Sequence, residues 1–184
     1  MNIIDTPLSG LKIIEPNIFS DSRGFFFESF KLDSYRKIGI ELPFLQDNVS
    51  RSSFGVLRGL HYQLKNPQGK LVTVISGEVF DVTVDIRVGS PTFGQWFGII
   101  LNDKNHKQLY IPPGFAHGFC VLSKRVDFHY KCTDYYNNED EHGISWNDKE
   151  INIAWQIKCD PILSNKDSKY SALSDVSVNL LPRF

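Results

Sequence analysis

Two strands joined by a tight turn are indicated by one stretch, Lys70-Leu71-Val72-Thr73-Val74-Ile75-Ser76-Gly77-Glu78-Val79-Phe80-Asp81-Val82-Thr83-Val84-Asp85-Ile86-Arg87. β-Branched and aromatic residues fill both halves, and Ser76-Gly77 between them is a turn signal. The second half has the two-residue period of a strand, with Phe80, Val82, Val84 and Ile86 on one face and Val79, Asp81, Thr83 and Asp85 on the other. Such a unit favours an all-β fold.

Other short strands are expected on both sides of this pair. They cover residues 11–16, 25–30, 45–51, 56–63, 95–101, 108–111, 118–122 and 126–133, with Gly, Pro and Asn in the turns, while a helical pattern covers only residues 32–39. This spacing predicts a β-sandwich or barrel. We therefore expect one domain over residues 1–184, with a barrel core at about 45–135, N-terminal strand additions and a short, partly helical C-terminal lid at about 155–184.

Charge and hydropathy exclude several classes of partner. The 184 residues include 20 basic and 21 acidic side chains, a net charge of -1, so there is no basic field for nucleic acid. The N-terminus has neither the basic region nor the apolar run of a signal peptide, and no stretch approaches the length of a membrane span. We expect a cytoplasmic protein that binds neither nucleic acid nor membrane.

The cysteines do not form a metal-ligand or disulfide pattern. Cys120, Cys132 and Cys159 are odd in number and widely spaced. We therefore interpret all three as small buried apolar residues in a reducing compartment.

The heptad Leu57-Arg58-Gly59-Leu60-His61-Tyr62-Gln63 carries the first candidate chemistry. His61 can exchange a proton near neutral pH, and Arg58 supplies a fixed positive charge. An ideal strand would point His61 and Gln63 to one face and Arg58 to the other, but a bulge at Gly59 could turn Arg58 toward His61. The simpler alternative is an ordinary strand with one structural histidine and one solvated arginine.

Asp81 and His117 are candidates for a buried pair. If the Asp81 face lines a barrel, this carboxylate needs a partner, and His117 follows the rigid turn Pro112-Pro113-Gly114. The other interpretation is that the Asp81 face is the wet face of the sheet. Histidines placed inside a small barrel are typical of cupins, many of which bind a metal through a His-x-His pair. Position 63 is Gln here, so we expect no metal.

Several ordered motifs resemble those of one family: Gly55-Val56-Leu57-Arg58-Gly59-Leu60-His61-Tyr62-Gln63, Gln68-Gly69-Lys70-Leu71-Val72, Gly77-Glu78-Val79-Phe80-Asp81-Val82, Ile111-Pro112-Pro113-Gly114-Phe115-Ala116-His117-Gly118-Phe119 and Tyr130-Lys131-Cys132-Thr133-Asp134-Tyr135-Tyr136. With them the chain resembles the dTDP-4-dehydrorhamnose 3,5-epimerase family, metal-free cupins with a double-stranded β-helix jelly roll. The likeness runs from Ser20 to Asp167. One departure is Val49, where the family leads us to expect histidine.

The resemblance implies a catalytic set and no cofactor. His61 would be the base, oriented by Asp167, and Tyr130 the acid on the opposite face of the sugar. Lys70 would stabilise the enolate at the C4 oxygen. The residue types alone favour His61 and Lys70 but do not single out Tyr130 among seven tyrosines.

The resemblance also implies a substrate-binding set. Its members are Arg23, Glu28, Gln46, Asp47, Asn48, Arg58, Gln63, His117, Glu141 and Lys166, with Asp81 in support. Arg23, Arg58 and Lys166 would supply positive charge for a diphosphate. Family members are homodimers in which an N-terminal segment reaches the partner's site, so we expect a homodimer. Whether Arg23 and Glu28 act in their own or the partner's site is left open.

The expected function is epimerisation of a dTDP-sugar at C3 and C5, for deoxysugar, polysaccharide or glycosylated-metabolite synthesis. Three alternatives stay open: an epimerase acting at C3 only or on another nucleotide-linked 4-keto-6-deoxy sugar, a non-catalytic sugar-binding cupin, and a metal-dependent cupin enzyme. The first depends on how the sugar ring sits between His61 and Tyr130.

Overall fold

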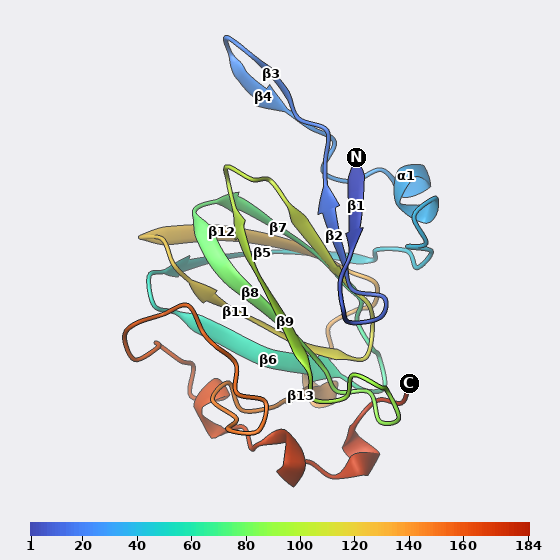
Figure 1. Ribbon diagram of the computed structural model, residues 1–184, viewed down its shortest axis with the longest axis vertical. Helices are drawn as coiled ribbons and strands as arrows, with labels where there is room; N and C mark the ends of the chain where they lie inside the picture. Colours follow the sequence, from blue (N-terminus) through green and yellow to red (C-terminus); the bar gives the residue numbers. More distant parts are fainter.

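Two antiparallel sheets face each other in the computed structural model, which describes residues 1–184 (Figure 1). One sheet has the order β1-β2-β10-β7-β12-β5 and the other β13-β6-β11-β8-β9. Their strands are β1 (Asn2–Asp5), β2 (Lys12–Glu15), β5 (Gln46–Ser53), β6 (Leu57–Gln63), β7 (Lys70–Ser76), β8 (Glu78–Asp85), β9 (Trp96–Asn102), β10 (Gln108–Ile111), β11 (Phe115–Val121), β12 (Arg125–Cys132) and β13 (Glu141–Gly143). The predicted all-β cupin jelly roll is confirmed.

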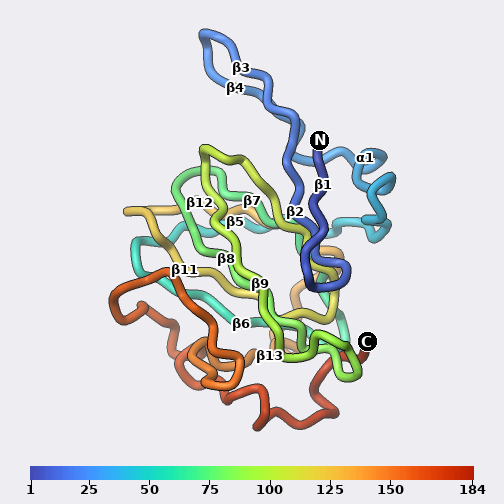
Figure 2. Tube along the Cα trace, viewed as in Figure 1, coloured from blue at the N-terminus to red at the C-terminus, as the bar shows by residue number.

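Strand β8 is buried on both of its faces. Val79 packs between the sheets with residues of β7, β11 and β12, while Phe80, Val82 and Val84 pack against the C-terminal segment. Figure 2 shows that segment, orange to red, passing along the β6 side of the barrel. Asp81 is therefore fully buried, and the interpretation of its face as a wet face is wrong.

A β-bulge interrupts β6 at Gly59, one of the two possibilities that the sequence left open. His117 of β11 pairs with His61 and Phe119 pairs with Arg58, so β6 has one extra residue between the two pairs. Gly59 has φ of 121° there, and a Cβ atom on it would lie 2.5 Å from Cα of Gly118. Only glycine fits this close crossing of two backbones. The bulge puts Arg58 and His61 on the wall of the same cavity.

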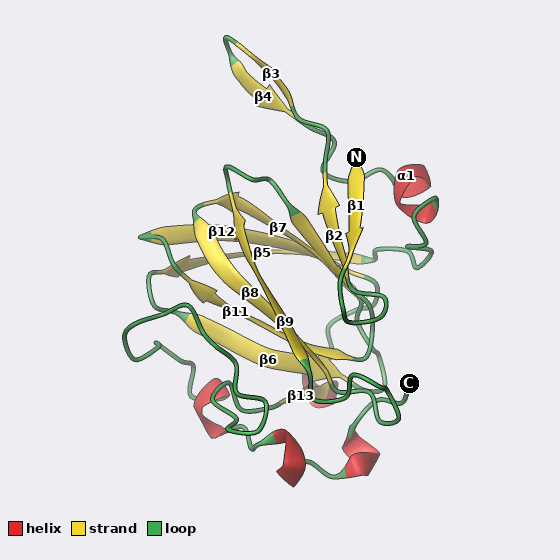
Figure 3. Cartoon of the chain, viewed as in Figure 1, coloured by secondary structure: helices red, strands yellow, loops and turns green.

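The N-terminal quarter differs from the sequence prediction. Instead of a strand over residues 25–30, a short hairpin of β3 (Phe19–Asp21) and β4 (Gly24–Phe26) projects away from the barrel (Figures 1 and 3). Phe19, Phe25 and Phe26 are exposed on this hairpin, so these apolar residues do not belong to a hydrophobic core of this chain. β1 was not predicted. The helical pattern forms α1 (Leu32–Arg36).

The C-terminal third contains few regular elements. η1 (Asn138–Asp140) precedes β13, and η2 (Asp167–Lys169), η3 (Leu173–Asp175) and η4 (Val178–Leu180) are single turns of 3₁₀ helix. The sequence did not indicate β13, because its three residues are too few for a periodic pattern. All three cysteines are free, but Cys159 is exposed, which corrects its predicted burial. No helix is long and apolar enough to span a membrane.

Candidate active site

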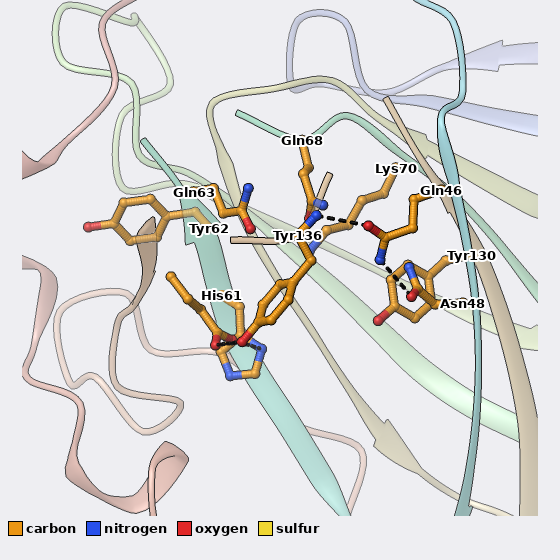
Figure 4. Close-up of a pocket in the computed structure, with 10 residues that line it drawn as sticks. Gln46, Asn48, His61, Tyr62, Gln63, Gln68, Lys70, Tyr130 and Tyr136 are labelled. Atoms are coloured by element: carbon orange, nitrogen blue, oxygen red, sulfur yellow. Dashed lines mark hydrogen bonds and ion pairs between the residues drawn. The ribbon is translucent and has the colours of Figure 1, made fainter. Parts of the chain in front are cut away.

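Two adjoining cavities of about 240 and 230 Å³ open between the facing sheets. His61, Lys70, Tyr130 and Glu141 line both cavities, so we treat them as one site. His61 comes from β6 and Tyr130 from β12 of the other sheet, and Figure 4 shows Lys70 of β7 reaching toward the same cavity. The jelly roll thus places an imidazole and a phenol on opposite walls.

His61 is held by a carboxylate from the C-terminal segment. Its Nε2 atom lies 2.6 Å from Oδ1 of Asp167, which is 3% exposed at the start of η2. Burial would raise the pKa of Asp167, but hydrogen bonds from His61 and Ser164 outweigh it, and the pKa is lowered. A carboxylate in this position keeps the proton on Nε2. The lone pair of Nδ1 is then free to accept a proton.

Glu141 faces that free nitrogen. Its Oε1 lies 3.8 Å from Nδ1 of His61, and its Oε2 accepts hydrogen bonds from Lys166 and, at 2.7 Å, from the phenol of Tyr136. The bond to Glu141 raises the pKa of Tyr136 to about 12. Burial would raise the pKa of Glu141, but the bonds from Lys166 and Tyr136 leave it lowered. A carboxylate therefore stands at the cavity side of His61.

Lys70 and Tyr130 are the polar groups across from His61. Burial lowers the pKa of Lys70, against the attraction of Asp81 and Glu141. Burial also raises the pKa of the Tyr130 phenol, which therefore keeps its proton and can donate it. A point charge and a phenol donor in a partly dry cavity suit stabilisation and reprotonation of an enolate.

Asp81 and His117 form the buried pair that the sequence suggested. Nε2 of His117 lies 3.0 Å from both Asp81 carboxylate oxygens. His117 is 7% exposed and Asp81 is 0% exposed. Burial raises the pKa of Asp81 and lowers that of His117, and the contact between the two opposes both shifts. Since His117 lines the second cavity, the pair forms part of its wall.

Of the remaining predicted residues, those with positively charged side chains line one cavity and those with amide side chains line the other. Arg58 and Lys166 line the second cavity, and Nε of Arg58 donates to the Ser52 hydroxyl at 3.1 Å. Gln46, Asn48 and Gln63 line the first cavity. The Gln63 side chain already bonds the backbone at Asn66, Tyr135 and Asn137, so it braces the loop after β12.

Three residues of the predicted substrate-binding set lie outside the cavities. Asp47 points to the opposite face of β5 from Gln46 and Asn48, where it bonds Nζ of Lys131 at 2.8 Å. The strand's two-residue period forces this, so the Asp47 side chain lines neither cavity, and its role in substrate binding stays a prediction. Arg23 and Glu28 lie in and just after the projecting hairpin, and Arg23 pairs with Asp21.

Four polar residues that were not predicted for the site also line the cavities: Ser50, Tyr62, Gln68 and Tyr136. Gln68 and Tyr136 belong to the motifs that contain Lys70 and Tyr130. Their closeness in sequence to Lys70 and Tyr130 could have indicated that they belong to the site. No group of three or more His, Cys, Asp or Glu side chains is arranged to hold a metal ion.

Comparison with known proteins supplies a family. The family model described as dTDP-4-dehydrorhamnose 3,5-epimerase matches residues 5–175. A relative of that name from Neisseria gonorrhoeae is 54% identical over 91% of this chain, which spans only about half (51%) of that relative's length. Another from Shigella flexneri is 53% identical, covering 91% of this chain and 93% of its own length.

A solved structure is similar over the whole chain. It is dTDP-6-deoxy-D-glucose-3,5-epimerase from Legionella pneumophila in complex with dTDP-4-keto-L-rhamnose. The sequences are 55% identical, the TM-score is 0.98, and the match covers 100% of this chain and 98% of that one. The likeness therefore extends to the N-terminal hairpin and the C-terminal segment.

Proposed function

The chain belongs to the dTDP-4-dehydrorhamnose 3,5-epimerase family, and we propose that it inverts C3 and C5 of dTDP-4-dehydro-6-deoxy-D-glucose to give dTDP-4-dehydro-L-rhamnose. Membership places it in the isomerase class, as predicted. The observation that carries the proposal is the placement of His61 and Tyr130 on opposite walls of one cavity that Lys70 also lines. Inversion next to a ketone needs a base and an acid on opposite faces of the carbon.

Nδ1 of His61 takes the proton from the carbon next to the C4 ketone. Asp167 holds the proton on Nε2 and stabilises the imidazolium that forms. The electron pair of the broken C–H bond moves to the C4 oxygen, giving an enolate. Lys70 stabilises this oxygen by its charge.

Tyr130 then returns a proton to the opposite face of the same carbon. Its raised pKa favours the protonated phenol, the form that this step requires. His61 then releases its proton to solvent and Tyr130 regains one from solvent, and repetition at the second carbon completes the reaction. A ring held so that only C3 comes between His61 and Tyr130 would be inverted there alone.

The diphosphate binds at Arg58 and Lys166, which line the second cavity together with Lys70. Arg23 and Glu28 reach the site of a partner subunit in a homodimer, and the exposed phenylalanines of the β3–β4 hairpin bury against that subunit. This is supported by the projection of the hairpin from its own barrel. A cytoplasmic location, supported by three free cysteines, stays a prediction.

Deuterium incorporation tests the reaction. The protein is incubated with dTDP-4-dehydro-6-deoxy-D-glucose in heavy water, and label at C3 and C5 is measured by NMR. We expect exchange at both carbons together with the L-rhamno product. Exchange confined to C3 would identify a C3-only epimerase, and absence of exchange at either carbon would contradict the proposal.

A further inference from the structure

The ring of Tyr170 stands edge-on against the imidazole of His61. The two ring centroids are 5.8 Å apart and the ring planes meet at 67°. This is the edge-to-face arrangement that aromatic rings prefer, at a separation within the usual range. Tyr170 directly follows η2, the turn that carries Asp167. One short segment therefore contacts His61 twice, through a hydrogen bond at Nε2 and through a packed ring.

The Tyr170 ring is fixed on its other side by the backbone of β13. Gly143 pairs directly with His61 across the β13–β6 ladder, and a Cβ atom on Gly143 would lie 2.4 Å from the Tyr170 ring. The ring thus fills the space where a side chain at position 143 would stand. The next residue, Ser171, accepts a 2.8 Å hydrogen bond from the backbone N–H of Ser145, which anchors the segment to the chain after β13.

The Tyr170 hydroxyl does not explain this placement. It is buried and has no hydrogen-bond partner, and Tyr170 lines neither cavity. The group that packs against His61 is the ring, and Tyr170 itself lines neither cavity. A buried hydroxyl without a partner contributes nothing to stability and is replaceable by hydrogen at little cost.

We propose that Tyr170 is a positioning residue whose ring fixes the imidazole of His61 in the orientation that bonds Asp167 and leaves Nδ1 facing the cavity. The inference rests on the proposed function in that His61 is taken as the base. Without the ring, rotation of His61 about its side-chain bonds would separate Nε2 from Asp167. Misplacement of a catalytic group by about 1 Å lowers a rate by about 100-fold.

Two substitutions separate the ring from the hydroxyl. Tyr170→Ala should lower kcat by about 10- to 100-fold while KM changes little, because the cavity walls stay intact. Tyr170→Phe keeps the ring and should retain kcat within about threefold of wild type. A loss in Tyr170→Phe equal to that in Tyr170→Ala would overturn the inference, since the hydroxyl would then be the acting group.

Gly143→Ala gives an independent way to move the ring. The added methyl group must displace Tyr170, so this variant should also lose kcat. In a Tyr170→Ala background the same methyl group enters empty space, and it should cause no further loss. Additive losses from the two substitutions would contradict coupling through the ring. This variant also serves if Tyr170→Ala does not fold.

The orientation can be read without any turnover. Long-range ¹H–¹⁵N NMR distinguishes a neutral histidine protonated at Nε2 from one protonated at Nδ1. His61 should be protonated at Nε2 in wild type and Tyr170→Phe, and a mixture of both tautomers in Tyr170→Ala or Gly143→Ala. An unchanged His61 signal in the last two variants would overturn the positioning role, even if the proposed reaction were correct. The expected mixture would support it even if the substrate were a different one.

Discussion

Among the single residues of the site, burial shifts the pKa values of Lys70 and Tyr130 toward their neutral forms. Lys70 has a lowered pKa and Tyr130 a raised one, both because they are withdrawn from water. Asp167 behaves in the opposite way, since its hydrogen bonds outweigh its burial. The dry environment makes the electrostatic effect of each group on an enolate larger than it would be in water.

Lys70→Ala tests the enolate contact. Loss of the charge should lower kcat by roughly 100- to 1,000-fold, as loss of an oxyanion donor does, with a smaller change in KM. Lys131→Ala is a matched control, because Lys131 pairs with Asp47 on the outer face of the same sheet. Steady-state kinetics decide between roles. A large rise in KM at normal kcat would make Lys70 a binding residue only.

The residues themselves revealed part of this site. His61 and Lys70 could be selected by type, and the Asp81–His117 pair followed from the cost of burying an unpaired charge. Tyr130 could not be chosen from residue types, because a phenol has the same sequence pattern whether it packs or reacts. Strand alternation in the run Gln46-Asp47-Asn48 already indicates that the Asp47 side chain points away from the face of its two neighbours.

At the scale of elements, the bulge in β6 sets the geometry of the site. Gly59→Ala should lower the free energy of unfolding by about 2–4 kcal/mol, because a Cβ atom there meets the backbone of Gly118 at a positive φ. Gly39→Ala is the control, with φ of 84° but open space around its Cβ, and should cost only about 1–2 kcal/mol. Denaturant unfolding measures both. Equal losses of unfolding free energy in the two variants would show that the backbones at Gly59 and Gly118 can move apart to admit a methyl group.

The turn after β8 should respond to acid. Burial would raise the pKa of Asp85, but hydrogen bonds from Arg87, Ser90 and Thr92 outweigh it and lower the pKa. A folded-state pKa below the unfolded value of about 4 stabilises the fold above that pH, and the effect is lost as pH falls. Asp85→Asn should therefore be less stable at pH 7 but lose less stability on acidification. Parallel pH profiles for mutant and wild type would contradict this.

The strands were predictable from sequence where their pattern is long. β5 to β12 have enough β-branched and aromatic residues between glycine and proline turns to be located within a few residues. β1 and β13, with four and three residues, are too short to show a period, whereas the equally short β10 is marked by the Pro112-Pro113-Gly114 turn that follows it. The prediction for the β3–β4 hairpin was wrong for another reason. Phe25 and Phe26 are apolar and yet exposed, so their burial could not be inferred from residue type.

At the scale of the whole molecule, the proposed dimer makes the site a product of two chains. If Arg23 acts in the partner's site, mixed dimers of Arg23→Ala and His61→Asn subunits contain one site with both defects and one with none. Mixing equal amounts of the two inactive variants under exchange conditions should restore about a quarter of wild-type activity. No recovery in demonstrably mixed dimers would place Arg23 in its own subunit's site.

The division of roles between His61 and Tyr130 is the central claim, and solvent deuterium exchange in two variants tests it most directly. His61→Asn should abolish both exchange at the substrate carbon and product formation. Tyr130→Phe should still form the enolate, so exchange with retained configuration should persist while inverted product falls much further. Equal loss of exchange and inversion in a folded, dTDP-binding Tyr130→Phe protein would contradict the account, as would undiminished exchange in His61→Asn.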